Sequence, residues 1–303
     1  MPSSFERSEE SSLAFGGQAV LEGVMIRSRR HAVTCVRRHN GEIVTLTTDI
    51  SPLSEKYRVL QLPFIRGIPS LVETLILGFK SLFLSANVVL EDEGETLTYK
   101  EFGFTAVMSL AIASFFLILP FLLTNLLLLT GMMFNLVEAV IRLSTFLIFL
   151  KLVSLWSQYK RVLQYHGAEH KVINTYEARE PLTLVHVKKN SRLHPRCGTS
   201  FIFITVLVSI LLLSIIPNRT LFERLAYRVF LLPVIGALSY EILRFSGKRR
   251  NVPIMKLMMM PGLAIQHLTT KEPDNDMLEV AIKAVSQVNK LRQDSLNARA
   301  ISM

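Results

Sequence analysis

Residues 102–156, FGFTAVMSLAIASFFLILPFLLTNLLLLTGMMFNLVEAVIRLSTFLIFLKLVSLW, decide the fold because they are almost continuously apolar. The stretch is more than twice as long as the roughly 20 residues that one helix needs to cross a bilayer. We therefore expect two membrane spans, joined by a turn between Thr124 and Asn135. Glu138 and Arg142 lie four residues apart on the second span and are expected to neutralise each other.

Two shorter apolar segments predict further spans. Residues 201–216 are apolar up to Pro217, and residues 226–245 form another segment, in which a proline and a glycine are tolerated as they are in membrane helices. The expected fold is therefore an α-helical polytopic membrane protein with about four transmembrane helices.

The charge of the chain agrees with this expectation. Half of the residues are hydrophobic while the net charge is +10, a combination unlike that of soluble nucleic-acid-binding proteins, so no nucleic-acid partner is expected. Residues 157–200 hold eight lysines and arginines, whereas none lies between Thr124 and Asn135. By the positive-inside rule, this loop and both termini face the cytoplasm. The lipid bilayer is the partner that the composition itself implies.

A small β-element is expected ahead of the membrane part, within residues 16–62. Residues 32–38 and 42–48 are rich in β-formers and flank an Asn40-Gly41 pair, which is typical of a tight hairpin turn. The remaining segments are assigned from their polarity as a disordered N-terminus (1–15), an interfacial amphipathic helix with an acidic linker (63–101), a cytoplasmic loop (157–200) and a cytoplasmic tail with an amphipathic helix (246–303).

The chemistry of the chain is indicated by the sequence His-Gly-Ala-Glu-His at residues 166–170. On a helix, His166 and His170 lie on one face and can hold one Zn²⁺. Glu169 then lies beside them as a candidate catalytic base for a metal-bound water, in the inverted order of the common zinc-peptidase motif. The alternative is a helix end at which the two histidines only cap or form hydrogen bonds.

Two places in the sequence offer further metal ligands. His194 and Cys197 stand three residues apart in a turn ahead of the third span, and a mixed set of histidine and cysteine favours zinc. Glu241 lies within the fourth span, where an ionisable group is costly unless it is paired or functional. Pairing of Glu241 with Arg244 or Lys248 is the alternative.

Four other polar residues are weaker candidates. If residues 18–22 are extended, Gln18 and Glu22 share a face and could point at a site, or Glu22 could be a solvated acid. Lys171 and Arg196 could bind an anionic group of a substrate, or could simply follow the positive-inside rule.

Four stretches together resemble the YqhQ-like family of bacterial membrane proteins of unknown function, described as predicted metal-dependent enzymes. They are Gly-Gly-Gln-Ala-Val-Leu-Glu-Gly-Val-Met-Ile-Arg at 16–27, Tyr-His-Gly-Ala-Glu-His-Lys at 165–171, His-Pro-Arg-Cys-Gly-Thr-Ser-Phe at 194–201, and Pro-Gly-Leu near 261 with Thr-Thr-Lys-Glu-Pro at 269–273. The resemblance implies a multi-pass protein of the bacterial cytoplasmic membrane and a metal-dependent activity.

Two functions of different classes remain open. The first is a zinc-dependent hydrolase or peptidase at the cytoplasmic membrane face, with Glu169 as general base. The second is a scaffold or assembly factor that docks a membrane-protein or peptide partner and holds a structural zinc with His166, His170, His194 and Cys197. A transporter is disfavoured because the sequence shows no repeat and no pair of broken helices. The oligomeric state is left open.

Overall fold

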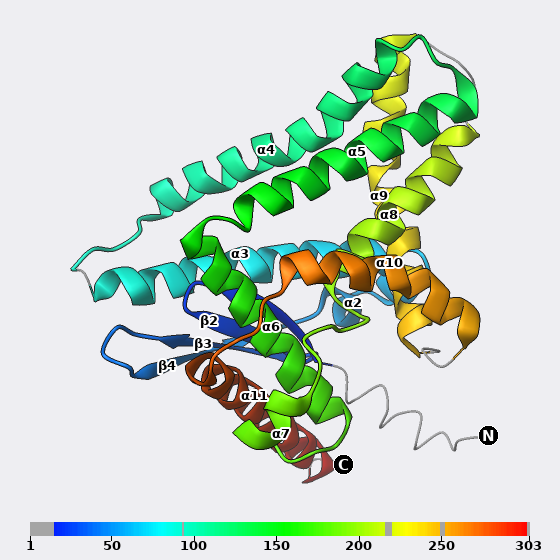
Figure 1. Ribbon diagram of the computed structural model, residues 1–303. Helices are drawn as coiled ribbons and strands as arrows, with labels where there is room; N and C mark the ends of the chain where they lie inside the picture. Colours follow the sequence, from blue (N-terminus) through cyan, green and yellow to red (C-terminus); the bar gives the residue numbers. More distant parts are fainter. Residues whose placement is uncertain (1–14, 93, 216–219, 249–251, 302–303) are drawn as a thin grey trace.

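The computed structural model describes residues 15–92, 94–215, 220–248 and 252–301. Residues 1–14, which make up almost all of the segment for which disorder was predicted, lie outside the described residues. Phe15 is buried, and its ring centroid lies 4.6 Å from that of Tyr176. The described chain is mostly helical, with one small sheet near the N-terminus (Figure 1).

The sheet has four antiparallel strands in the order β1-β2-β3-β4, which confirms the small N-terminal β-element. The predicted Asn40-Gly41 turn joins the last two strands, and Gly41 adopts a positive φ of 87°, which glycine tolerates better than other residues. The strands are β1 (Gly16–Val20), β2 (Gly23–Arg27), β3 (His31–Arg37) and β4 (Ile43–Asp49).

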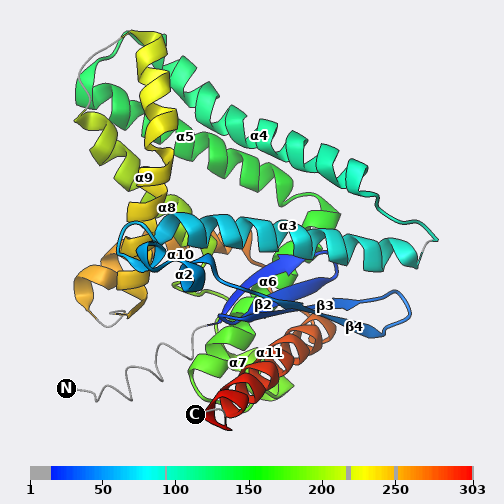
Figure 2. The same ribbon diagram turned by 180° about the vertical axis from the view of Figure 1, so that it is seen from behind.

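Both faces of the sheet are covered, because the buried side chains of β2 and β3 alternate between two cores. Val24 and Cys35 point into a core shared with α6 (Ser157–Glu177) and α11 (Asn275–Ile301). Met25 and its neighbours on the other face pack against α3 (Gly67–Glu91). Figures 1 and 2 show the resulting layers, with α3 on one side of the sheet and α6 and α11 on the other.

Several apolar helices extend away from these layers (Figure 1). Among the described residues, the helices long and apolar enough to cross a membrane are α3, α4 and residues 222–246 of α9, and α8 is apolar but shorter. The expected number of four spans is therefore not confirmed, since residues 131–153 and α8, which hold two of the predicted spans, are not among these helices. In contrast, α3, expected to be interfacial, meets the length and composition of a span. The extended helices are α4 (Tyr99–Asn125), α5 (Gly131–Val153), α8 (Gly198–Ser214) and α9 (Leu221–Lys248).

The predicted pair between Glu138 and Arg142 is present on α5, but it is part of a larger group. Arg228 of α9 also binds Glu138, with its Nε 3.2 Å from both carboxylate oxygens. The side chains of Glu138 and Arg228 are 2% and 5% exposed. A buried charge needs a partner, so this contact ties α9 to α5. The sequence alone did not identify Arg228.

The remaining helices are short or lie beside the layers. In α10, Gly262 packs so closely on Ser200 of α8 that a Cβ would come within 2.6 Å of the serine hydroxyl. The predicted amphipathic helix of the tail is α11, which begins one residue before Asp276. The other described helices are α2 (Leu53–Lys56), the 3-10 helix η1 (Arg58–Gln61), α7 (Leu184–Lys189) and α10 (Pro253–Thr269).

Candidate metal centre

The residues of the His-x-x-Glu-His motif lie on α6, as predicted, and they meet Cys197 from the turn that precedes α8. One nitrogen of His166, one nitrogen of His170 and the sulfur of Cys197 all lie within 4.8 Å of one another. The ring centroids of the two histidines are 4.4 Å apart. Two imidazoles and a thiol are a ligand set that zinc prefers.

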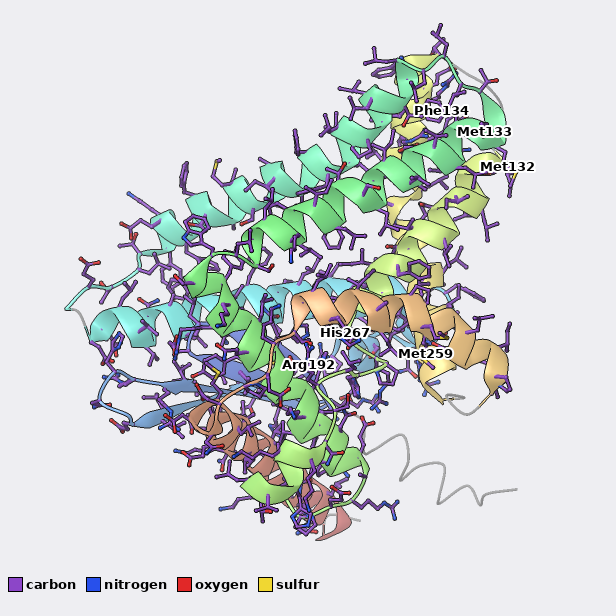
Figure 3. The ribbon with its side chains drawn as sticks, viewed as in Figure 1. Met132, Met133, Phe134, Arg192, Met259 and His267 are labelled. Atoms are coloured by element: carbon purple, nitrogen blue, oxygen red, sulfur yellow. The ribbon has the colours of Figure 1, made fainter. Side chains whose placement is uncertain are left out.

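Both histidines are oriented by backbone carbonyl groups. His166 Nδ1 lies 2.8 Å from the carbonyl oxygen of Thr269, and His170 Nδ1 lies 2.7 Å from that of Arg192. Because a carbonyl oxygen only accepts hydrogen bonds, each Nδ1 carries the hydrogen and each Nε2 keeps its lone pair. Arg192 lies between α6 and the chain that follows α10 (Figure 3). Metal-bound histidines in proteins are commonly held this way.

Cys197 is placed to act as a thiolate. Its sulfur lies 3.2 Å from His166 Nε2 and 3.4 Å from the hydroxyl of Thr199. Burial raises the pKa of Cys197, but hydrogen bonds from Thr199 and the hydrogen bond and charge of a doubly protonated His170 outweigh it, so without a metal the pKa of the thiol lies below its usual value. With the neutral ring that a metal requires, the cation itself would stabilise the thiolate. Burial also lowers the pKa of His170, which favours the neutral imidazole that a metal requires.

Glu169 lies beside the cluster without being one of its three members. It is 5% exposed, and its Oε2 atom is buried with no hydrogen-bond partner among the described residues. Burial raises the pKa of Glu169 to about 8. The carboxylate packs directly on β1, since a Cβ added at Gly17 would lie 2.5 Å from Glu169 Oε1. A buried, unpaired carboxyl beside a ligand cluster is a candidate for proton transfer.

His194 is near the cluster but is not brought into it. Its ring centroid lies 5.6 Å from that of His170, and its Nε2 lies 3.5 Å from Oε1 of Glu177. Gln266 of α10 fixes the backbone of His194, accepting from its N–H and donating to its carbonyl oxygen at 2.8 Å each. The structure therefore brings together three of the four ligands that a closed site would need.

Glu241 is engaged elsewhere. Both of its carboxylate oxygens accept hydrogen bonds of 2.6 Å from Arg66, at the start of α3. Of the two partners considered from sequence, Arg244 acts on Glu241 only through its nearby charge, and the side chain of Lys248 lies outside the described residues. The ion pair joins α3 to α9, and Gly67 beside Arg66 packs against the backbone of Ala237. The structure gives Glu241 a structural contact and does not bring it to the histidines.

We predict that Glu241→Gln leaves the metal content of the purified protein unchanged. The variant should lower stability by about 1–2 kcal/mol, because Arg66 loses a charged partner in a partly buried place. Elemental analysis and thermal unfolding of wild type and variant check both parts. A loss of metal in the variant would contradict the prediction and would show that metal binding depends on Glu241.

Gln18 of β1 and Glu22, which was expected to extend the same strand, make their contacts away from the cluster. The amide oxygen of Gln18 lies against Gly78 of α3. Glu22 lies in the β1–β2 turn with a positive φ of 49°, and Arg161 of α6 donates to it at 2.6 Å. Glu22 therefore holds the turn to α6, while Gly17, one residue before Gln18, is the part of β1 that touches the site.

The two basic candidates are also held by internal contacts. Lys171 is 4% exposed, and its ammonium donates to the carbonyl oxygens of Lys188 and Asn190 and pairs with Glu272 at 2.6 Å. Arg196 pairs with Glu177, the same carboxylate that lies near His194. These contacts connect α6 to the segments around α7 and α10.

Sequence reasoning missed the groups that orient the histidines. The carbonyl groups of Thr269 and Arg192 could not be identified, because every residue carries one. Gly17 and Gln266 were also missed as neighbours of the site. A partial signal existed for Thr269, since it begins the Thr-Thr-Lys-Glu-Pro stretch whose role was left unassigned.

The family described as "Protein of unknown function (DUF1385)" matches residues 62–291. A curated relative, "Uncharacterized protein YqhQ" of Bacillus subtilis (strain 168), is 39% identical in an alignment that covers 92% of this chain and 93% of the relative. No solved structure matches the chain. The family match covers the cluster and the long apolar helices, and the relative matches most of the chain. Both confirm the resemblance to YqhQ-like proteins, and neither assigns the metal-dependent activity that the resemblance implied. The chain therefore belongs to the DUF1385 family of proteins of unknown function.

Proposed function

We propose that this protein is a membrane-anchored zinc-dependent hydrolase in which His166, His170 and Cys197 hold the metal. The observation that carries the proposal is the convergence of two oriented Nε2 atoms and a thiol beside the buried, unpaired carboxyl of Glu169. Three protein ligands with a position left for water are typical of catalytic zinc sites, whereas structural sites use four.

A bound zinc ion would supply Lewis acidity and would lower the pKa of water at the open position. Glu169 would accept a proton from the attacking water and return it to the leaving group. In hydrolysis of a peptide bond, the water oxygen bonds to the carbonyl carbon, the C–N bond breaks, and the proton held by Glu169 goes to the amine. The raised pKa of about 8 suits the step in which Glu169 returns a proton to the leaving group, and the positive charge of a bound zinc would favour the carboxylate that the base step needs. A peptide substrate follows by analogy with peptidases that share the inverted motif.

The site would lie at the cytoplasmic face of a bacterial inner membrane, with both termini in the cytoplasm. The three described helices of spanning length support the membrane location. The eight lysines and arginines of residues 157–200 support the orientation. In this arrangement α6 carries the site just outside the bilayer, where the substrate would be a segment of a membrane protein or a peptide released at the membrane.

The second candidate is a structural zinc that clamps a scaffold. It is favoured by the burial of the cluster, in which His170 is 2% and Cys197 is 9% exposed. It is also favoured by the way the cluster joins α6, the turn before α8 and the carbonyl groups of Thr269 and Arg192. In this case the partner would dock elsewhere, and the metal would hold the soluble layers to the apolar helices.

Cobalt substitution distinguishes the two candidates. We expect the cobalt-loaded protein to show thiolate charge-transfer absorption, and we expect added azide to shift its visible bands, because an open position exchanges ligands. We expect Glu169→Gln to keep stoichiometric cobalt, since Glu169 is not a ligand. An unchanged spectrum after addition of azide would contradict the proposal of a hydrolase and support a structural zinc site. A protein that binds no metal would contradict both candidates.

A further inference from the structure

A second candidate site lies among the apolar helices, apart from the metal centre. It is a cavity of about 410 Å³ between α4, α5, α8 and α9, which is within the range of small-molecule pockets. Most of its walls are apolar, with Phe116 and Phe146 on one side and Ile235 on the other. Leu110 and Leu232 also line it and remain 62% and 46% exposed. The cavity therefore opens on the apolar outer surface of the helices.

Two guanidinium groups interrupt this apolar lining, those of Arg142 and Arg228. Both bind the same carboxylate, Glu138, which is 2% exposed. The three contacting side chains thus leave one positive charge in excess. A buried charge without a counter-ion is costly, and more so where lipid surrounds the protein.

The two arginines differ in how fully they are satisfied. Arg228 donates to Glu138, to Asn135 Oδ1 at 3.3 Å and to the carbonyl oxygen of Arg224 at 3.1 Å. Its guanidinium also lies 5.4 Å from the ring centroid of Phe134, which stands at the far end of the helical hairpin (Figure 3). In contrast, the Nε atom of Arg142 is buried with no hydrogen-bond partner among the described residues. Arg142 is therefore the less satisfied of the two, and its side chain, which lines the cavity, is also the more exposed, at 17% against 5% for Arg228.

We propose that the cavity binds a single-chain carboxylate amphiphile from the bilayer, a long-chain fatty acid, with its carboxylate on Arg142. One carboxylate balances the one excess charge, and guanidinium groups bind carboxylates with good geometry. The acyl chain occupies the cavity and packs against its apolar side chains. The volume of about 410 Å³ is sufficient for one acyl chain.

Binding of radiolabelled palmitate to the full chain, purified in an uncharged detergent, tests the proposal. We expect saturable binding of one palmitate per chain. Methyl palmitate, which has the same chain without the charge, should compete at least about 10-fold more weakly, because it lacks the charge-assisted hydrogen bond. Arg142→Gln should weaken palmitate binding by a similar factor. Lys151→Gln, which removes a positive charge from an exposed position on the same helix, should bind like wild type.

A second variant tests whether the acyl chain occupies the cavity, and it leaves the charged residues unchanged. Ser114 lines the cavity on α4 and is exposed, so Ser114→Phe should be tolerated by the fold and should block the bound chain. It keeps the test valid if Arg142→Gln fails to fold. The proposal is overturned if palmitate does not bind saturably, if methyl palmitate competes equally, or if binding to Ser114→Phe is undiminished. Displacement of palmitate by equimolar phosphatidylglycerol would assign the cavity to a two-chain lipid and would also overturn it.

Discussion

Replacing Cys197 with alanine is expected to lower zinc affinity by at least about 100-fold. The thiol is the third member of the cluster, and loss of a group that merely orients a ligand already costs 10–100-fold in other metal proteins. The substitution removes no hydrogen-bonding cap from α8, since Cys197 makes no side-chain cap there. The loss should therefore appear in metal content measured by elemental analysis, in protein that still purifies as a folded species.

The chain provides a matched control for this prediction. Cys35 is the other cysteine, and it is buried in the sheet, where its sulfur contacts Thr45. Cys35→Ala should keep full zinc content. For the histidines, His170→Ala should lose zinc, and His267→Ala, on the exposed side of α10, should keep it. Equal metal content in Cys197→Ala and Cys35→Ala would show that Cys197 is not a ligand. The proposed site would then have two histidines, which are too few to hold zinc firmly.

Replacing Gly167 with alanine is expected to destabilise the protein by about 3 kcal/mol. Gly167 lies between the ligands on α6, and a Cβ there would come within 2.1 Å of the carbonyl oxygen of Lys271. That segment cannot move away easily, because the N–H of Lys271 donates to the carbonyl oxygen of Leu163 at 2.8 Å. Overpacking against backbone is costly. Thermal unfolding followed by circular dichroism should show a midpoint lower by roughly 5–10 °C.

Gly198→Ala is the control for the same chemical change beside the same site. Gly198 begins α8, directly after Cys197, and no atom outside its immediate surroundings lies within 4 Å of the position of a Cβ. Its stability should stay within about 1 kcal/mol of wild type. The displaced segment in Gly167→Ala also carries Thr269, which orients His166, so that variant should bind zinc more weakly as well. A wild-type midpoint for Gly167→Ala would show that α6 and residues 269–273 are not packed together.

The local parts of the fold could be predicted because local patterns encode them. The Asn40-Gly41 turn between runs of β-formers predicted the hairpin, and the spacing of His166 and His170 placed both on one face of a helix. The pairing of Glu138 with Arg142 followed from a four-residue separation. Each of these contacts lies within one element or between neighbours in the chain.

The contacts between distant segments could not be predicted in the same way. Arg66 reaches Glu241 across 175 residues, and no pattern in the sequence marks that pair. The same is true of Arg228, which joins the pair on α5. The helix at Gly67–Glu91 was expected to lie at the membrane interface, yet its buried residues pack on the sheet while its composition also suits a span. Composition describes how apolar a helix is, but it does not say what covers each face.

The two ends of the chain build one core, and this has a consequence for biosynthesis. The sheet is complete once Asp49 has been translated, but α11, which covers one of its faces, begins only at Asn275. The ribosome makes every described apolar helix in the interval, so one face of the nascent sheet stays uncovered until those helices have been translated. The core that α11 closes can therefore form only after all of these helices have been synthesised. A chain truncated before α11 would leave apolar strands uncovered, which is the kind of surface that quality-control proteases recognise.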